Sequence, residues 1–187
     1  RSAIHDTKKH FFYIQECVNT KKYDLINPYI KSSIDVLDAS YSRINTGNLV
    51  IDSFVSNYIN IANEQNIKFI SDIRVQNYRI PIKDFDLCII IGNMLENSLH
   101  AVSGINNDST KLIEVHMYYA NEMLVINTKN NYERTNIKEH SLYHGYGLQN
   151  IDNITQKYNG TFTTFIEDNY FYAVCSVPLP DDMVIYK

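Results

Sequence analysis

The N-terminal part of the chain spaces its apolar residues as amphipathic helices do. Apolar positions recur every three, four or seven residues in two stripes, which a polar link at residues 19–22 separates. Pro28 stands in the first turn of the second helix, where its missing N–H costs nothing. Two helices of this size form a hairpin that cannot bury both stripes alone, so we expect residues 1–44 to dimerise into a four-helix bundle. The stripes consist of Ile4, Phe11, Ile14 and Val18, and of Ile30, Ile34, Leu37 and Tyr41.

The pattern changes after a turn-forming cluster at residues 45–48, and residues 45–187 are predicted to be a second domain. An irregular segment is expected at 128–144. The order of the elements predicts an α+β fold in which helices form one layer on a mixed, mostly antiparallel sheet, a two-layer α/β sandwich. Periodicity predicts helices at about 49–64, 84–102 and 147–158, and strands at about 67–73, 111–119, 122–127, 160–167 and 170–177.

Charge and cysteine content exclude several classes of protein. The formal net charge is -4 and no basic cluster is present, which argues against a nucleic-acid partner. The three cysteines lie in apolar stretches at spacings that suit neither a metal site nor a disulfide framework, which favours a reducing compartment. No run of about 18 apolar residues is present. We expect a cytoplasmic domain whose upstream portion, a membrane sensor, is missing.

The helix predicted at 84–102 has a polar face that suits a metal or a phosphate ligand. Asn93, Asn97 and His100 follow the spacing i, i+4, i+7, which places them on one face of the helix. Amide oxygens are hard ligands suited to Mg²⁺. The alternative is an ordinary polar face exposed to solvent.

Two glycines precede the helix predicted at 147–158. Gly145 and Gly147, within the segment 144–148, allow a ligand to approach the backbone closely. The helix N-terminus that follows them offers free N–H groups to a phosphate. The alternative is a tight turn without a ligand.

A histidine followed by an acid stands near the start of the first predicted helix. His5 offers a nucleophilic imidazole, and the carboxylate of Asp6 can orient the ring or accept its proton. The alternative is plain helix surface.

These three motifs, in this order, resemble the cytoplasmic core of sensor histidine kinases, whose ATP-binding domain belongs to the GHKL superfamily. Residues 93–97 match the N box of that family, 144–148 its glycine-rich G box and 4–6 its phosphoacceptor box. The chain is most similar to the Gram-positive peptide quorum-sensing and virulence sensor kinases. In that subgroup the usual Asp-x-Gly-x-Gly motif is lacking, and residues 125–129 stand in its place here.

The resemblance implies a site for ATP and Mg²⁺. Asn97 would ligate the metal, Asn93 would assist at the metal and the phosphates, and the oxygen of Asn127 would accept a hydrogen bond from the amine of adenine. The remaining residues that the resemblance assigns to nucleotide binding are His100, Thr128, Lys129, His144, Gly145, Tyr146, Gly147 and Leu148.

The resemblance also implies the reaction. His5 would attack the γ-phosphoryl group of ATP with help from Asp6, and the phosphoryl group would pass to an aspartate on the receiver domain of a response regulator. Two alternatives stay open. One is a phosphotransferase or pseudokinase that no longer binds ATP, and the other is a dimeric signalling adaptor without enzymatic activity.

Overall fold

A computed structural model describes residues 2–33, 44–75, 80–105, 111–133 and 141–180, with the backbone alone at 2–10, 30–33 and 141–145. The chain divides into two compact units, Arg1–Ser40 and Tyr41–Lys187. In the described parts of both units, no helix combines the length and the apolar character needed to cross a bilayer.

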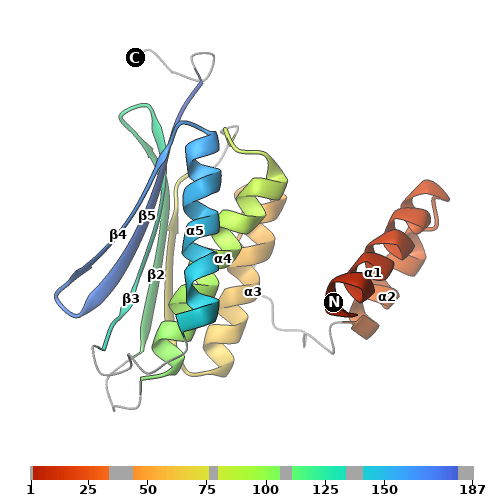
Figure 1. Ribbon diagram of the computed structural model, residues 1–187, viewed down its shortest axis with the longest axis horizontal. Coiled ribbons are helices and arrows are strands. Elements are labelled where there is room, and N and C mark those ends of the chain that lie inside the picture. Colours follow the sequence, from red (N-terminus) through yellow and green to blue (C-terminus); the bar gives the residue numbers. More distant parts are fainter. Residues whose placement is uncertain (1, 34–43, 76–79, 106–110, 134–140, 181–187) are drawn as a thin grey trace. The chain divides into compact units, whose positions relative to one another are not determined.

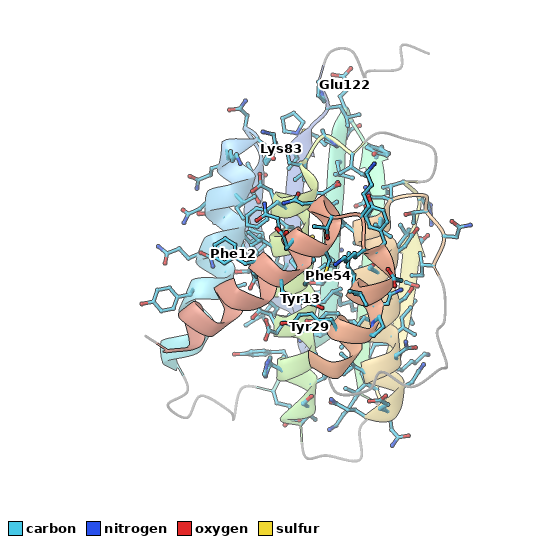
Figure 2. The ribbon with its side chains drawn as sticks, turned by 90° about the vertical axis from the view of Figure 1, so that its right-hand side faces the viewer. Phe12, Tyr13, Tyr29, Phe54, Lys83 and Glu122 are labelled. Atoms are coloured by element: carbon cyan, nitrogen blue, oxygen red, sulfur yellow. The ribbon has the colours of Figure 1, made fainter. Side chains whose placement is uncertain are left out.

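The N-terminal unit is helical. It contains α1 (Ser2–Asn19), a short 3₁₀ helix η1 (Tyr23–Leu25) and α2 (Ile26–Ser33). Tyr13 of α1 and Tyr29 of α2 pack together with their ring centroids 4.1 Å apart (Figure 2). Pro28 lies in the first turn of α2 as expected, whereas the later residues of the second predicted stripe, Ile34, Leu37 and Tyr41, lie outside the described residues.

The second unit has two layers, a sheet with helices on one of its faces (Figure 1). The order of the strands in the sheet is β1-β2-β3-β5-β4, in which β1 runs parallel to β2 and the other neighbours are antiparallel. The α+β fold with a mixed, mostly antiparallel sheet is thereby confirmed. The helices are α3 (Leu49–Glu64), α4 (Asp84–Ser103) and α5 (Ser141–Lys157), and the strands are β1 (Lys68–Ile73), β2 (Leu112–Ala120), β3 (Met123–Asn131), β4 (Thr161–Glu167) and β5 (Tyr170–Pro178).

One apolar core lies between the two layers. The strands contribute every second side chain to it, because successive residues of a strand point to opposite faces of a sheet. Gly92 of α4 lets α3 come close, since a Cβ at this position would lie 3.0 Å from Cε1 of Phe54. The largest fully buried side chains include Ile51 of α3, Leu87, Ile91 and Leu95 of α4, Ile113 of β2, Ile126 of β3 and Ile151 of α5.

The start of α3 shows why the sequence predicts this helix accurately. The side chain of Asn48 accepts hydrogen bonds from the N–H groups of Val50 and Ile51, which caps the free donors of the first turn. Asp52 in that turn accepts from both the N–H and the hydroxyl of Thr46. Because of these local contacts, α3 begins directly after the turn-forming residues 45–48, as the sequence predicts.

Two elements differ from the sequence-based prediction. β3 continues to Asn131, although residues 128–131 are polar and were expected to be irregular. Its backbone pairs with β2 on one side and β5 on the other, so hydrogen bonds between strands hold a segment that lacks apolar periodicity. Similarly, α5 begins at Ser141 rather than near residue 147.

A buried carboxylate joins the first turn of α4 to the last turn of α5. Asp86 is 6% exposed and accepts hydrogen bonds from Nζ of Lys157 at 2.6 Å and from the hydroxyl of Tyr158 at 2.5 Å. The same hydroxyl accepts from the N–H of Lys83 at 3.1 Å. The hydrogen bonds from Lys157 and Tyr158 hold the pKa of Asp86 below its ordinary value of 3.8.

We expect Asp86→Asn to lower the free energy of unfolding by about 1.5–3 kcal/mol at neutral pH, because it removes a charge-assisted hydrogen bond from a buried group. Since the pKa of Asp86 is lowered in the folded state, its contribution is complete above pH 3.8 and is lost as the pH falls through the folded pKa. Urea unfolding of both proteins at several pH values measures this difference, which should shrink in acid. Asp72→Asn, which alters an exposed ion pair with Arg74, should have a much smaller effect.

Candidate functional site

Two amide side chains on α4 form the centre of the candidate site. The opposite side of α4 is apolar and buried against the sheet, which turns Asn93 and Asn97 away from the middle of the core. Nδ2 of Asn93 donates to the carbonyl of Ile89, one turn earlier, at 2.8 Å. This bond fixes the orientation of the Asn93 amide.

Gly147 of α5 meets both amides. A Cβ at Gly147 would lie 3.3 Å from Oδ1 of Asn93 and 3.7 Å from both Oδ1 and Nδ2 of Asn97. Any side chain at this position would therefore fill the space beside the two amide groups. The structure brings the two separate sequence motifs together at this contact.

Gly147 lies at this site as part of a helix, whereas the prediction placed it in a turn before a helix. Because α5 begins at Ser141, Gly145 and Gly147 lie inside the helix, and the N-terminal N–H groups of α5 are not at these glycines. Glycine in a helix interior costs up to about 1 kcal/mol relative to alanine. Gly147 is thus explained by the close approach to Asn93 and Asn97 rather than by a turn.

The other residues of the glycine motif have different surroundings. Leu148 packs against the core, whereas the side chain of Tyr146 is exposed. His144 and Gly145 lie in the first turns of α5, where the structure describes the backbone alone.

Several buried polar side-chain atoms lack a hydrogen-bond partner, and one of them belongs to Asn97 of this site. In the described parts of the chain, such atoms are Nδ2 of Asn97, Oγ1 of Thr128, Oδ1 of Asn127 and Oδ1 of Asn57. An unsatisfied buried donor or acceptor costs about 1–3 kcal/mol, so native proteins rarely keep one without a reason. A ligand atom that accepts a hydrogen bond from Nδ2 of Asn97 would remove this cost at the site.

Thr128 and the residues next to it in β3 point to opposite faces of the sheet. Leu124 and Ile126 belong to the core under the helices, and Thr128, two residues further, is 1% exposed on that same face. Asn127 and Lys129 lie on the opposite face, where Nζ of Lys129 is 3.2 Å from Oε1 of Glu114. The structure therefore brings Thr128 to the helix side of the sheet and does not bring Asn127 or Lys129 there.

Asn130 is a polar residue of the helix-facing row that the sequence analysis does not single out. It is 1% exposed, and its Nδ2 donates to the carbonyl of Asn131 at 2.9 Å. The signal in the sequence is its spacing, since Ile126, Thr128 and Asn130 follow the two-residue period of a strand. Because residues 127–131 are all polar, this period does not appear as an alternation of apolar and polar residues.

His100, His5 and Asp6 are the remaining predicted residues. The side chain of His100 is 59% exposed on α4, with Nε2 3.7 Å from Oε1 of Glu96. His5 and Asp6 lie in α1, which belongs to the N-terminal unit and has its backbone alone described at these positions.

The residues at this site fit a nucleotide with its magnesium ion. No cluster of three His, Cys, Asp or Glu side chains suitable for a metal occurs among the described residues. A magnesium ion here would rely on an amide oxygen, water and the phosphates of a ligand, which is how Mg²⁺ commonly binds. Gly147 leaves room beside the amides, and the unpartnered Nδ2 of Asn97 can donate to an anionic ligand.

We expect Thr128→Val to raise the free energy of unfolding by about 1 kcal/mol, because valine replaces a buried hydroxyl that has no partner with a methyl group of the same shape. Urea unfolding measures the change. Thr155→Val is the matched control: Thr155 is also buried, but its hydroxyl donates to the carbonyl of Ile151 at 2.7 Å, so this substitution should destabilise the protein. Equal destabilisation by both substitutions would show that the hydroxyl of Thr128 is satisfied in the folded protein.

Solved structures of histidine kinases share the fold. The nucleotide-free catalytic domain of histidine kinase ThkA has a TM-score of 0.59 and 14% identity, over 76% of this chain and all of that one. Acinetobacter baumannii histidine kinase AdeS has a TM-score of 0.56 and 7% identity, over 95% of this chain and 98% of that one. The mycobacterial sensor histidine kinase MprB has a TM-score of 0.52 and 12% identity, over 69% of this chain and 93% of that one. At these identities the likeness concerns the fold alone.

The sequence comparisons give the family. No curated protein matches the chain. The family model of the GHKL domain matches residues 82–178, which include α4, β3, α5 and every residue placed at the candidate site. Because this match spans more than half of the 187 residues, the chain belongs to the GHKL domain family.

Proposed function

We propose that this chain is the core of a protein histidine kinase that binds Mg-ATP in its GHKL domain and transfers a phosphoryl group to His5. The observation that carries the proposal is the meeting of Asn93 and Asn97 with Gly147, beside a buried amide donor that has no partner. A ligand with acceptor atoms, such as a phosphate, would complete this arrangement.

Each residue of the site would have its own role in binding the nucleotide and its metal. When bound, Mg-ATP would supply the phosphoryl group, and its metal would offset the charge of that group. Oδ1 of Asn97 would ligate the metal, and its Nδ2 would donate to a phosphate oxygen. Asn93, whose amide is held by the carbonyl of Ile89, would assist at the metal, while Gly147 keeps side-chain atoms out of the space.

In the proposed reaction the phosphoryl group passes to a side chain rather than to water. Asn93, Asn97, Gly147 and Thr128 carry no group that accepts a proton near neutral pH, so they cannot activate water as a base. An imidazole needs no such activation, because it is largely neutral at pH 7 and carries a lone pair. His5 would form the new P–N bond through this lone pair while the bond between the γ-phosphorus and the bridging oxygen breaks and ADP leaves, and its ring proton would pass to Asp6.

Exposed apolar side chains on the N-terminal unit support the homodimer in this proposal. Large apolar side chains of α1 are exposed, among them Phe11 and Phe12 at 66% each and Val18 at 47%. Such surface favours a homodimer through the N-terminal helices. The phosphoryl group would then pass to the receiver domain of a response regulator, and a peptide-sensing membrane region upstream, as in the quorum-sensing kinases, would control the reaction.

We expect incubation with Mg²⁺ and γ-labelled ATP to place an acid-labile, alkali-stable label on the chain. His5→Gln should abolish the label and leave nucleotide binding unchanged by calorimetry, because it removes the acceptor alone. Asn97→Ala should abolish both, because it removes the metal ligand. His10→Gln is the matched control, since it alters the other histidine of α1 and should keep the label.

The outcomes of this experiment separate the alternatives. Absence of nucleotide binding in the wild-type chain contradicts the kinase and agrees with the pseudokinase. Binding without a label, or an undiminished label on His5→Gln, contradicts the role of His5. A non-enzymatic adaptor requires that His5→Gln leave signalling intact in cells.

We also expect the chain to sediment as a dimer at micromolar concentration and Phe11→Ser to shift it toward monomer, because the substitution removes apolar surface that the partner would cover. Phe85→Ser is a suitable control, because Phe85 is 76% exposed but lies on α4 of the other unit. A monomeric wild-type chain, or equal effects of both substitutions, would contradict an interface on α1.

A further inference from the structure

We propose that the free edge of β4 binds the same edge of a second copy of this chain, in an antiparallel register centred on Thr164, so that the two sheets become one. This inference goes beyond the proposed kinase activity. It concerns the edge of the sheet rather than the nucleotide site, and a contact separate from the one expected through α1.

β4 is an edge strand with one open side. It ends the strand order and pairs with β5 along all of its 7 residues, and among the described residues no strand pairs with its other side. The N–H and C=O groups on that side are free to pair with another strand. Every residue of β4 except Phe162 is exposed, and Figure 1 shows the tip of the β4–β5 hairpin apart from the helices. The edge is therefore accessible.

β4 lacks the features that usually prevent edge strands from pairing. Proteins protect such edges with lysine, proline or a β-bulge. β4 contains no Lys, Arg or Pro, and its register with β5 is unbroken. Its composition of Thr, Phe and Ile favours strands, and Glu167 at its end is its one charged residue.

The other edge strand, β1, is protected by charge. Within its six residues it carries Lys68 and Asp72. Asp72 forms an ion pair with Arg74 and lies 3.9 Å from Nδ1 of His116 on β2. A strand that added to β1 would have to cover these charged groups, so β4 is the edge that is suited to pairing.

Symmetry restricts how two copies of β4 can pair. A twofold axis between two identical antiparallel strands keeps the helices of both copies on the same face, so each residue lies opposite one of its own face. A centre at Thr164 is the register that pairs the full length of both strands. It places Phe162 opposite Ile166 and Thr163 opposite Phe165. Moving the centre by one residue leaves an end of each strand unpaired.

The pairs formed in this register are chemically compatible. An aromatic residue opposite a β-branched one, as in Phe162 with Ile166, stabilises a sheet. The ring of Phe165 stacks on Tyr172 of β5 with centroids 4.7 Å apart, which holds it ready for its partner. Glu167 lies opposite Thr161, so the carboxylates of the two copies do not face each other. A second copy thus fits this edge without a charge clash.

The contact is small. Stable interfaces bury about 1,200–2,000 Å² in total, and two short strands that pair along their edges cover less. We therefore expect pairing through β4 to be weaker than the contact through α1 and to need a higher protein concentration.

The test is disulfide cross-linking of the full chain with Thr164→Cys under mild oxidation, at about 100 μM because the interface is small. In the proposed register the two introduced cysteines have Cα atoms about 4.5–5.5 Å apart, which suits a disulfide. We expect a covalent dimer on a non-reducing gel, with peptide mapping placing the bond between the two introduced cysteines. No such bond in the folded variant would overturn the inference, and so would an edge that binds only a segment of another protein.

Thr161→Cys is the matched control, because it alters another exposed threonine of the same strand. Its two copies would lie about 20 Å apart, six residues along the strand. The yield of dimer should be at least about tenfold lower than with Thr164→Cys, because a disulfide cannot span that distance. Equal yields from the two variants would contradict the register.

A second pair of variants tests the contact without cysteine chemistry. In the Phe11→Ser background, which weakens the contact through α1, Thr164→Lys should shift the remaining dimer to monomer in sedimentation, because two ammonium groups would face each other. Thr161→Lys should retain the dimer, because its ammonium group would face Glu167 of the other copy. Equal effects of the two lysines, or a monomer before either is introduced, would contradict pairing through β4. Nucleotide binding by these variants should stay unchanged, which separates this inference from the proposed function.

Discussion

Gly147 brings the backbone of α5 within van der Waals reach of two amide side chains on α4, and the site depends on this contact. A Cβ at Gly147 would lie 3.3 Å from Oδ1 of Asn93, a tight contact that would require the amide to shift. Nδ2 of Asn97, 3.7 Å from the same position, is buried and makes no hydrogen bond. Because Gly147 has no side chain, the space beside the two amides stays open.

Burying unpartnered polar groups costs stability, and other contacts must compensate for it. The apolar core between the sheet and the three helices supplies most of this stability. Asp86 adds a link between the same two helices that meet at Gly147, because it joins the start of α4 to Lys157 and Tyr158 at the end of α5. The unpartnered Nδ2 of Asn97 thus lies near Gly147, while the hydrogen-bonded carboxylate of Asp86 joins the two helices elsewhere.

Elements whose ends are defined by local signals could be predicted well from the sequence. The bounds of α3 agree because Asn48 and Asp52 act within one turn of the helix start. The bounds of β3 and α5 differ because their signals are not local. Residues 128–131 are polar and lack apolar periodicity, yet strands on both sides pair with them. The glycines of α5 are typical of a turn, yet the helix continues through them and uses one for close packing against α4.

By itself the sequence determined the α+β class, the positions of most elements and the pair Asn93 and Asn97, because each of these follows from spacing along one helix or strand. Only the tertiary structure decided which residues meet. It placed Gly147 beside the two amides and put Thr128 under the helices, with Asn127 and Lys129 on the opposite face. The physical reason is that the face of a strand depends on register with its neighbours, and a shift of one residue exchanges the two faces.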